Sequence, residues 1–344
     1  MKDESVSAPR RSRRGSGAVT LHDVARLAGV APITASRALN QPGQVSAEVL
    51  QRVSEAVAAT GYVRNHQAGG LASARSRLVA ALVPTVAGPM FASTVQALSD
   101  ALAAEGYQLL LGQSGYGDSR EDALLEAIIG RRPDGIVLTG TGHSALARQR
   151  LRAARIPVVE TWDLGDEPID MLVGFSHEAV GRAVAGFLHD RGYRRLAMLA
   201  GDDPRSMRRA EAFAAQAALL GLPTVPVLQV AAPTTLRSGR DGLTALLRSQ
   251  PDCEAVFCSS DLLALGVITE AQARGLAVPR QLAVVGFGDQ DFAADLHPAL
   301  STVRIDSQAM ARQAVRFIVD RADGHEVSGQ SVDIGFSIVG RQST

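Results

Sequence analysis

Cysteine is scarce in this chain of 344 residues, which contains only Cys253 and Cys258. Their C-x4-C spacing lacks the second cysteine pair or the histidines that a zinc site requires. Cys258 ends the apolar run AVFC, a pattern typical of a strand in a core. The sequence therefore predicts a buried thiol in a reducing compartment rather than a metal ligand, and it predicts no cofactor.

Long apolar runs are also missing, since none approaches the roughly 20 residues of a transmembrane helix. The charged N-terminus lacks the apolar centre of a signal peptide. No P-loop or G-x-S-x-G motif is present, and the glycine clusters near Gly140 and Gly286 lack dinucleotide-binding spacing. No glutamate or histidine completes a metal shell around Asp289, Asp291 and Asp295. We therefore expect a cytoplasmic protein that is not an enzyme and does not contact a membrane.

Charge is balanced overall, with 35 basic and 35 acidic residues, but it is unevenly distributed. Residues 1–77 contain 11 Lys and Arg against 5 Asp and Glu, whereas residues 78–344 contain 24 against 30. A basic head on an acidic body is typical of a protein in which one part meets phosphate and the other does not.

The most informative stretch is TLHDVARLAGVAPITASRALN, at residues 20–40. Thr20 and Asp23 have the spacing of a helix start, because their side chains can accept from otherwise unpaired backbone N–H groups. Apolar residues then follow at helical spacing, at Leu21, Val24, Ala25 and Ala28. Gly29 fits the sharp turn that ends the helix, and Pro32 fits the first turn of the next. The stretch therefore predicts a helix-turn-helix.

The second helix of this motif has two distinct faces. Ala35, Ala38 and Leu39 can face inward, whereas the outer face consists of Pro32, Ile33, Ser36 and Arg37. Ser46 can cap a third helix, which Gly61 ends and whose apolar positions are Val49, Leu50, Val53 and Val57. An exposed polar side on a helix-turn-helix indicates a DNA-binding regulator. The fold class is therefore predicted to begin with an all-α helix-turn-helix head, residues 19–61.

Two segments flank this head. Residues 1–18 form a basic tail that is predicted to be disordered, or alternatively an arm that makes weak phosphate contacts. Residues 62–77 read as a flexible basic linker, in which Asn65 is a possible N-cap and Gly69 and Gly70 oppose helix formation.

The body, residues 78–344, alternates continuous apolar runs with amphipathic segments. The strand candidates are LVAALV, YQLLLG, GIVLT, PVVET, MLVGF, RLAMLA, AVFCS and LAVVGF. The helix candidates are Phe91–Glu105, Ser119–Ile129, His177–Arg191, Arg208–Leu219 and Asp261–Arg274. This alternation favours α/β lobes with parallel sheets covered on both faces, and its length favours two doubly wound lobes with a ligand cleft between them.

From residue 19 to about residue 340 the chain resembles the LacI/GalR family of transcriptional regulators. The motifs that carry the resemblance are TLHDVARLAGV, TASRALN, the S-x-E-x-x-x-x-V pattern of the third helix, GYVRN, CSSDLLALG and VVGFGDQDFAADLHPALSTVRID. The resemblance implies a body like the periplasmic sugar-binding proteins, and a homodimer on a near-palindromic DNA operator. Tetrameric members carry a C-terminal leucine heptad helix, which is missing here, so a dimer is expected.

The resemblance also implies roles for residues of the head. The second helix would enter the major groove, with Pro32, Ile33 and Arg37 toward base edges and Arg37 able to contact guanine with two hydrogen bonds. Ile33 could equally serve in packing. Phosphate contacts are expected from Thr20, Thr34, Ser36 and Asn40.

The linker corresponds to the family's hinge helix, which orders on DNA and inserts a leucine into the minor groove. Leu71 occupies that position, Ala68 and Ala72 are small enough for close approach, and Asn65 would begin the helix. The chain departs from the family at Arg64, where proline is usual, and at the Gly69–Gly70 pair. Alternatively, Leu71 packs beneath the body.

Within the family, the body resembles the gluconate-operon repressors through LVPTVAGPMFAS, DGIVLTGTGH and IPVVETWD. A sugar acid needs a cation for its carboxylate, for which Arg205 or Arg209 is expected. The remaining expected wall and hydroxyl partners are Phe91, Tyr116, His143, Glu160, Asp163, Phe175, Ser260 and Asp289. Alternatively, His143 and Tyr116 only order their loops. Gly288 replaces an aspartate that many family members have.

The leading hypothesis is therefore a repressor of sugar-acid catabolism genes that leaves its operator when gluconate or a relative binds. The alternatives are a neutral or phosphorylated sugar as the effector, a corepressor-dependent repressor or activator, and a sugar-binding protein without a regulatory role. Residues 20–60 and the missing signal peptide argue against the last alternative.

Overall fold

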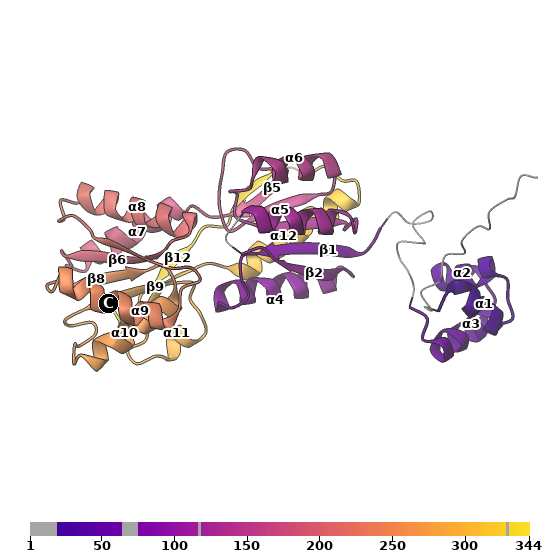
Figure 1. The fold of residues 1–344 in the computed structure, drawn as a ribbon, viewed down its shortest axis with the longest axis horizontal. Coiled ribbons are helices and arrows are strands. Elements are labelled where there is room, and N and C mark those ends of the chain that lie inside the picture. The colour runs from indigo at the N-terminus through magenta and orange to yellow at the C-terminus, as the bar shows by residue number, and fades with distance from the viewer. Residues whose placement is uncertain (1–18, 64–74, 116–117, 328–329) are drawn as a thin grey trace, which may run out of the picture. The chain divides into compact units, whose positions relative to one another are not determined.

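The computed structural model describes residues 19–63, 75–115, 118–327 and 330–344 (Figure 1). The chain divides into two units, Met1–Ala74 and Arg75–Thr344, and each is described separately below.

The head contains three helices and one 3-10 turn. They are α1 (Leu21–Leu27), α2 (Pro32–Asn40), the turn Pro42–Gln44 and α3 (Ala47–Thr60). Thr20 and Asp23 form the reciprocal cap before α1, Pro32 opens α2, and Gly29 adopts a φ of 63° between the two helices. The core consists of small side chains: Val24, Ala25, Ala28, Ala35, Ala38, Val53 and Ala56. The predicted helix-turn-helix is confirmed, and the predicted loop after it contains the 3-10 turn.

The first lobe of the body, lobe I, contains a six-stranded parallel sheet in the order β11-β5-β4-β3-β1-β2. Its strands are β1 (Leu78–Val83), β2 (Gln108–Gln113), β3 (Gly135–Thr139), β4 (Val158–Thr161), β5 (Met171–Gly174) and β11 (Ser331–Asp333). Alternate residues face different layers, since Val79 packs in the cluster that contains residues of α4 and α12, and Ala80 packs with residues of α5 and α6. These helices are α4 (Pro89–Ala104), α5 (Asp118–Ile129), α6 (Ala145–Ala154) and α12 (Ser307–Ala322).

The second lobe, lobe II, has the strand order β12-β10-β9-β8-β6-β7. Its strands are β6 (Leu196–Gly201), β7 (Val227–Val230), β8 (Ala255–Cys258), β9 (Ala283–Phe287), β10 (Ser301–Arg304) and β12 (Ser337–Val339), and its helices are α7 (His177–Asp190), α8 (Pro204–Leu219), α9 (Leu236–Ser249), α10 (Asp261–Ala273) and α11 (Phe292–Asp295). Only β10 and β12 pair antiparallel among the described strands.

The predicted pair of doubly wound lobes is confirmed, although the sequence reading missed several elements. These are β7, β10, β11, β12, α6, α9, α11 and α12. The edge strands β11 and β12 have three residues each and at most two apolar side chains, so they lack the long apolar run of a central strand. The chain crosses between lobes after β5, between β10 and α12, and between β11 and β12. Helix α12 packs against α4, β4 and β5 of lobe I.

Among the described helices, none is both long and apolar enough to cross a membrane.

Candidate functional site

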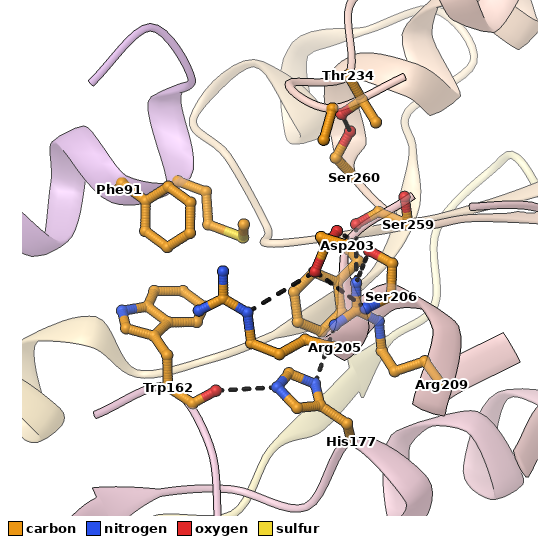
Figure 2. A pocket seen from close by; sticks show the side chains of 13 residues that line it. Phe91, Trp162, His177, Asp203, Arg205, Ser206, Arg209, Thr234, Ser259 and Ser260 are labelled. Atoms are coloured by element: carbon orange, nitrogen blue, oxygen red, sulfur yellow. Dashed lines mark hydrogen bonds and ion pairs between the residues drawn. The ribbon is translucent and has the colours of Figure 1, made fainter. Parts of the chain in front are cut away.

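A small cavity lies between the two lobes, where strand ends and helix starts of both lobes meet (Figure 2). We call it the cleft. Its volume is about 50 Å³, and its lining residues are Met90, Phe91, Trp162, His177, Asp203, Arg205, Ser206, Arg209, Ala232, Thr234, Ser259, Ser260 and Phe287. Of the ten predicted effector contacts, the structure places Phe91, Arg205, Arg209 and Ser260 in this wall.

The start of α8 brings two arginines into the cleft. Asp203 caps the helix by accepting from Ser206 N at 3.2 Å, and Pro204 fits the first turn, which needs no N–H. The helix therefore begins at Pro204, four residues before the predicted start at Arg208. Arg205 lies in the first turn and Arg209 lies one turn further, so both reach the same cavity.

Arg205 retains an unused donor in the cleft. Its guanidinium lies 5.4 Å from the centre of the Phe91 ring, and its Nε lies 3.7 Å from the Asp203 carboxylate. Its Nη1 is buried without a hydrogen-bond partner, and a Cβ added at Gly140 of lobe I would lie 3.6 Å from that atom. Arg205 thus extends from lobe II toward lobe I with a donor that a ligand can use.

Arg209 is already engaged by protein groups. Only 3% of the residue is exposed, and it donates to His177 Nδ1 at 2.9 Å, Ser206 Oγ at 3.0 Å and Ser259 O at 3.3 Å. Its guanidinium also lies 4.1 Å from the centre of the Phe287 ring. Burial lowers the pKa of Arg209 to about 10, which still leaves it charged at neutral pH. The terminal nitrogens of Arg209 therefore hold groups of the cleft wall together, and its buried Nε has no partner among the described residues.

His177 is held neutral between two partners. Because a guanidinium only donates, His177 Nδ1 must accept from Arg209, and Nε2 carries the proton that it donates to Trp162 O at 2.9 Å. Burial first, and then the charges of Arg209 and Arg205, hold the pKa of His177 well below its usual value. The cleft lining thus carries two cations and one anion, the Asp203 carboxylate, for a net charge of +1.

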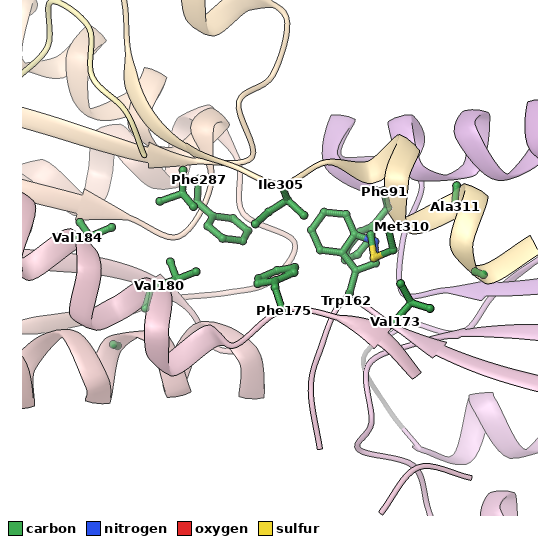
Figure 3. Close-up of a cluster of buried hydrophobic side chains, with 14 of the residues drawn as sticks. Phe91, Trp162, Val173, Phe175, Val180, Val184, Phe287, Ile305, Met310 and Ala311 are labelled. Atoms are coloured by element: carbon green, nitrogen blue, oxygen red, sulfur yellow. The ribbon is translucent and has the colours of Figure 1, made fainter. Parts of the chain in front are cut away.

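The aromatic rings of the cleft wall belong to a cluster of buried hydrophobic side chains (Figure 3). Trp162 meets Phe91 and Phe175 edge to face, with ring centres 5.6 and 5.8 Å apart, and its Nε1 donates to Thr94 Oγ1 at 3.2 Å. Phe175 is fully buried in this cluster and lies outside the cleft lining. Trp162 has a φ of 67°, which is unusual for a bulky residue and typical of functional sites.

Hydroxyl groups of lobe II complete the wall. Thr234 Oγ1 and Ser260 Oγ lie 2.8 Å apart, and Ser259 Oγ accepts from Gly201 N at 2.9 Å. The sequence reading identified Ser260 but missed Trp162, His177, Asp203, Ser206, Thr234, Ser259 and Phe287. Trp162 and Ser259 directly follow β4 and β8, so their places at the carboxyl ends of parallel strands could have indicated them.

His143 and Glu160, two other predicted contacts, lie together inside lobe I rather than in the cleft wall. His143 Nδ1 lies 2.6 Å from Glu121 Oε1, and its Nε2 lies 3.0 Å from Gly140 O and 3.6 Å from Glu160 Oε1. Burial opposes the charge of His143, but the hydrogen bond and charge of Glu121 and the charge of Glu160 outweigh it and raise the pKa. Glu160 is fully buried, which raises its pKa, and it accepts from Ile169 N at 2.6 Å.

Asp163 and Asp289 are likewise occupied outside the cleft wall. Asp163 pairs with Arg208 of α8 and accepts from Thr141 Oγ1 at 3.2 Å. Asp289 pairs with Arg304 at 2.5 Å and Arg341 at 2.7 Å. These carboxylates are held by protein cations, so the structure gives them positioning contacts rather than a place at the cavity. Tyr116 lies outside the described residues.

The outer face of α2 is solvated. Pro32, Ile33 and Arg37 are exposed, with Ile33 60% exposed, and the helix contains no acidic residue. Thr34 and Ser36 are half-buried at its side. An exposed isoleucine beside an exposed arginine, on a helix without carboxylates, is suited to contact with a DNA groove.

Three of the predicted phosphate contacts, Thr20, Ser36 and Asn40, already make intramolecular hydrogen bonds. Thr20 Oγ1 donates to Asp23 Oδ2 at 2.7 Å, and Asn40 Nδ2 donates to Ser36 Oγ at 3.1 Å. The predicted hinge residues Asn65, Ala68, Leu71 and Ala72 lie outside the described residues.

Over the part of the chain that the structure describes, no group of three or more His, Cys, Asp or Glu side chains is arranged to hold a metal ion. Cys253 and Cys258 are both buried and unpaired, as the sequence predicts for Cys258, and burial raises the pKa of Cys253 to about 11.

Comparison with known proteins identifies relatives of both units. Residues 20–65 match the model of bacterial regulatory proteins of the lacI family, and residues 185–344 match that of the periplasmic binding protein-like domain. The HTH-type transcriptional regulator GntR of Pseudomonas aeruginosa is 37% identical over 99% of this chain and 100% of the relative, and GntR of Escherichia coli is 30% identical over 92% and 96%. The structure of a LacI family regulator from Silicibacter pomeroyi is 29% identical, covers 94% of this chain and 99% of its own, and has a TM-score of 0.88.

Proposed function

The chain belongs to the LacI family of bacterial DNA-binding transcriptional regulators, and we propose that it is a repressor that leaves its operator when a sugar acid such as gluconate binds in the cleft. The name GntR of two relatives and the resemblance of the body to gluconate-operon repressors support this effector class. We further propose that the protein acts as a homodimer on a near-palindromic operator, which the head reads through Arg37 and α2.

The observation that carries the proposal is the buried, unpartnered Nη1 of Arg205 in a cleft with a net charge of +1. A carboxylate placed there satisfies that donor and neutralises the excess charge, and a charge-assisted hydrogen bond is the stronger kind. A neutral sugar would leave the charge uncompensated. A phosphorylated sugar acid would bring more negative charge than the lining can balance.

The rest of the lining fits a polyhydroxylated chain. Thr234 and Ser260 can exchange hydrogen bonds with hydroxyl groups, because each hydroxyl both donates and accepts. Phe91, Trp162 and Phe287 offer ring faces and edges to the C–H groups of the ligand. The lining therefore combines polar side chains for hydroxyl groups with aromatic rings for the carbon chain.

Signal transfer to DNA requires that the ligand favour one arrangement of the lobes. The cleft is formed by both lobes, and Asp163 of lobe I pairs with Arg208 of lobe II beside it. A ligand that bridges Arg205 and lobe I would change the balance between lobe arrangements, and operator DNA would favour the other arrangement. The two effects must be reciprocal.

Calorimetric titration of the full-length protein tests the effector class. We expect gluconate to bind to the wild type and to Arg131→Gln, a control that removes an exposed arginine of lobe I. Arg205→Gln should weaken gluconate binding by about 2 kcal/mol, because a charged hydrogen bond is lost. Tight binding of glucose or 6-phosphogluconate with no binding of gluconate would reject the sugar-acid assignment, and unchanged gluconate binding by Arg205→Gln would reject the anchor.

A further inference from the structure

A second and larger cavity lies at the far edge of the lobe I sheet. Its volume is about 540 Å³, and it is formed by the end of α6, the starts of β4 and β5 and the end of α12. The cleft residue Trp162 follows the other end of β4. Since parallel strands run in one direction, the two cavities lie at opposite edges of the sheet, and they have no lining residue in common. We call this second cavity the basal cavity.

Cations surround the basal cavity, whereas its inner wall is aliphatic. The cations are Arg152, Arg155 and Arg321, and the aliphatic wall includes Ile156, Pro157 and Ile169. Arg152 and Arg155 are exposed, and neither makes an ion pair with another described residue.

A single acidic side chain, Asp170, lines the basal cavity. It pairs with Arg321 at 2.9 Å and accepts from Val158 N at 3.2 Å. The lining therefore has a net charge of +2 after that pairing. The Nε of Arg321 is buried without an acceptor among the described residues. Arg152 and Arg155 are thus the cations available to a ligand.

The chemistry of this lining favours an organic phosphate. Guanidinium groups match the geometry of phosphate oxygens and are weakly hydrated, so they bind phosphate well at a partly enclosed site. A phosphate monoester carries about 1.5 to 2 negative charges at neutral pH, close to the net charge of the lining. We propose that the basal cavity binds a small organic phosphate monoester, with its phosphate between Arg152 and Arg155 and its apolar part against Ile156 and Ile169.

The basal cavity also lies beside the point where the chain enters the body. Ala322 lines the cavity, and its carbonyl accepts from Arg75 Nη2 at 2.5 Å. Arg75 also pairs with Asp323 at 2.5 Å, and it belongs to the predicted hinge, residues 62–77. A ligand at this position acts on the end of α12 that holds Arg75. A ligand in the basal cavity should therefore change the affinity of the protein for its operator, as a ligand in the cleft does.

Calorimetric titration with phenyl phosphate tests the site, since this probe combines a dianion with an apolar ring. The full-length protein is used at constant ionic strength set with sodium chloride, because surface charge effects depend on salt. We expect saturable binding to the wild type, weaker binding of phenol and of inorganic phosphate, and a loss of at least about tenfold in the double variant Arg152→Gln/Arg155→Gln. Arg131→Gln and Arg205→Gln should bind phenyl phosphate as the wild type does.

Two results would overturn the assignment of the site: no saturable binding, or binding that Arg205→Gln abolishes and the double variant retains. The second result would place the phosphate in the cleft. The effect of this ligand on DNA binding is measured with an operator selected from random DNA. Saturating phenyl phosphate should change operator affinity at least about twofold in the wild type and leave it unchanged in the double variant. An unchanged wild-type affinity would disprove the coupling, and none of these outcomes depends on whether gluconate is the effector.

Discussion

The proposed DNA-reading face, which is the exposed side of α2, and the cleft are built in opposite ways. The face lies on nine consecutive residues of α2, whose start and turn are fixed by neighbours such as Gly29 and Pro32. The cleft draws on residues from Met90 to Phe287, which reach one cavity only because two sheets place their strand ends together. The residues proposed to contact DNA are therefore neighbours in the sequence, whereas the residues of the cleft come together only after the body has folded.

The arginine side chains of the two regions also differ in exposure and in their partners. Arg37 is exposed on a helix without carboxylates, so its charge is available to DNA. Arg209 of the cleft is buried and supports His177 and Ser259, so its charge is used within the protein. Arg205 is only half-buried, but its Nη1 atom is buried and has no hydrogen-bond partner. The role of an arginine in the cleft thus depends on its protein partners, whereas the charge of an arginine on the outer side of α2 is open to solvent.

A methyl group added behind the cleft should have the largest effect. A Cβ at Gly174, the last residue of β5, would lie 1.7 Å from the carbonyl oxygen of Asp163, so Gly174→Ala must displace the segment that carries Trp162. We expect the free energy of unfolding of the body to fall by about 3 kcal/mol. Trp162 is the only tryptophan of the chain, so urea unfolding followed by its fluorescence measures the change.

Gly186→Ala is the matched control. Gly186 lies inside α7, and its added Cβ would meet no atom within 4 Å, so helix propensity alone should make this variant about 1 kcal/mol more stable or leave it neutral. Equal unfolding midpoints for the two variants would show that the Asp163 segment can move away from Gly174 at no cost, which would contradict their close packing.

The reading helix should respond to the loss of one side chain with a change of specificity. Arg37→Ala should cost about 1–3 kcal/mol at a single operator base pair while leaving gluconate binding intact. Arg26→Ala removes an equal charge from α1 and should weaken binding to all DNA sequences alike. Affinities for a set of operators with single base changes distinguish the two patterns. An unchanged preference in Arg37→Ala would remove Arg37 from the reading set.

The cap of α1 tests how local the head is. Thr20→Ala removes the hydroxyl that accepts from Asp23 N, and it should lower the free energy of unfolding of the head by about 1 kcal/mol, whereas Thr20→Ser should keep the cap. Circular dichroism of the full-length variants records the head transition, and gluconate titration records the cleft. A loss of gluconate binding in Thr20→Ala would contradict the separation of the two regions.

The smallest effect concerns pH. The pKa of His143 is raised in the folded body, so its charged form stabilises the fold below the unfolded pKa of about 6.5, and that contribution is lost as pH rises through the folded pKa. Between about pH 6 and pH 8 the wild-type body should lose more stability than His143→Gln, whose side chain does not titrate. Head stability, measured by circular dichroism, should be the same in both proteins. Identical pH profiles of the body would contradict the contacts between His143 and Glu121.

The sequence predicted most of the head because its signals are short-range. The Thr20 and Asp23 pair, Gly29 and Pro32 each fix backbone geometry within four residues, and all of them take their predicted places. The central strands were equally clear, since a strand buried on both faces must be continuously apolar. The core of the fold could therefore be predicted from the sequence alone.

The residues of the cleft could be predicted from the sequence only in part. His143, Asp163 and Asp289 were predicted as effector contacts from the resemblance of the body, but their partners Glu121, Arg208 and Arg341 are distant in sequence. No local pattern indicates that such partners exist. The choice between Arg205 and Arg209 likewise depended on His177 and Ser259, which only the folded body brings into contact with Arg209.

The central proposal is that a ligand in the cleft controls DNA binding by the head. Release of the operator by that ligand tests it most directly. Operator affinity is measured by fluorescence anisotropy, with a DNA site selected from random sequence, while gluconate is titrated into the wild type and into Arg205→Gln. We predict that both proteins bind the operator equally without gluconate and that gluconate lowers the affinity of the wild type alone. An unchanged wild-type affinity at saturating gluconate, or equal release from Arg205→Gln, would contradict the account.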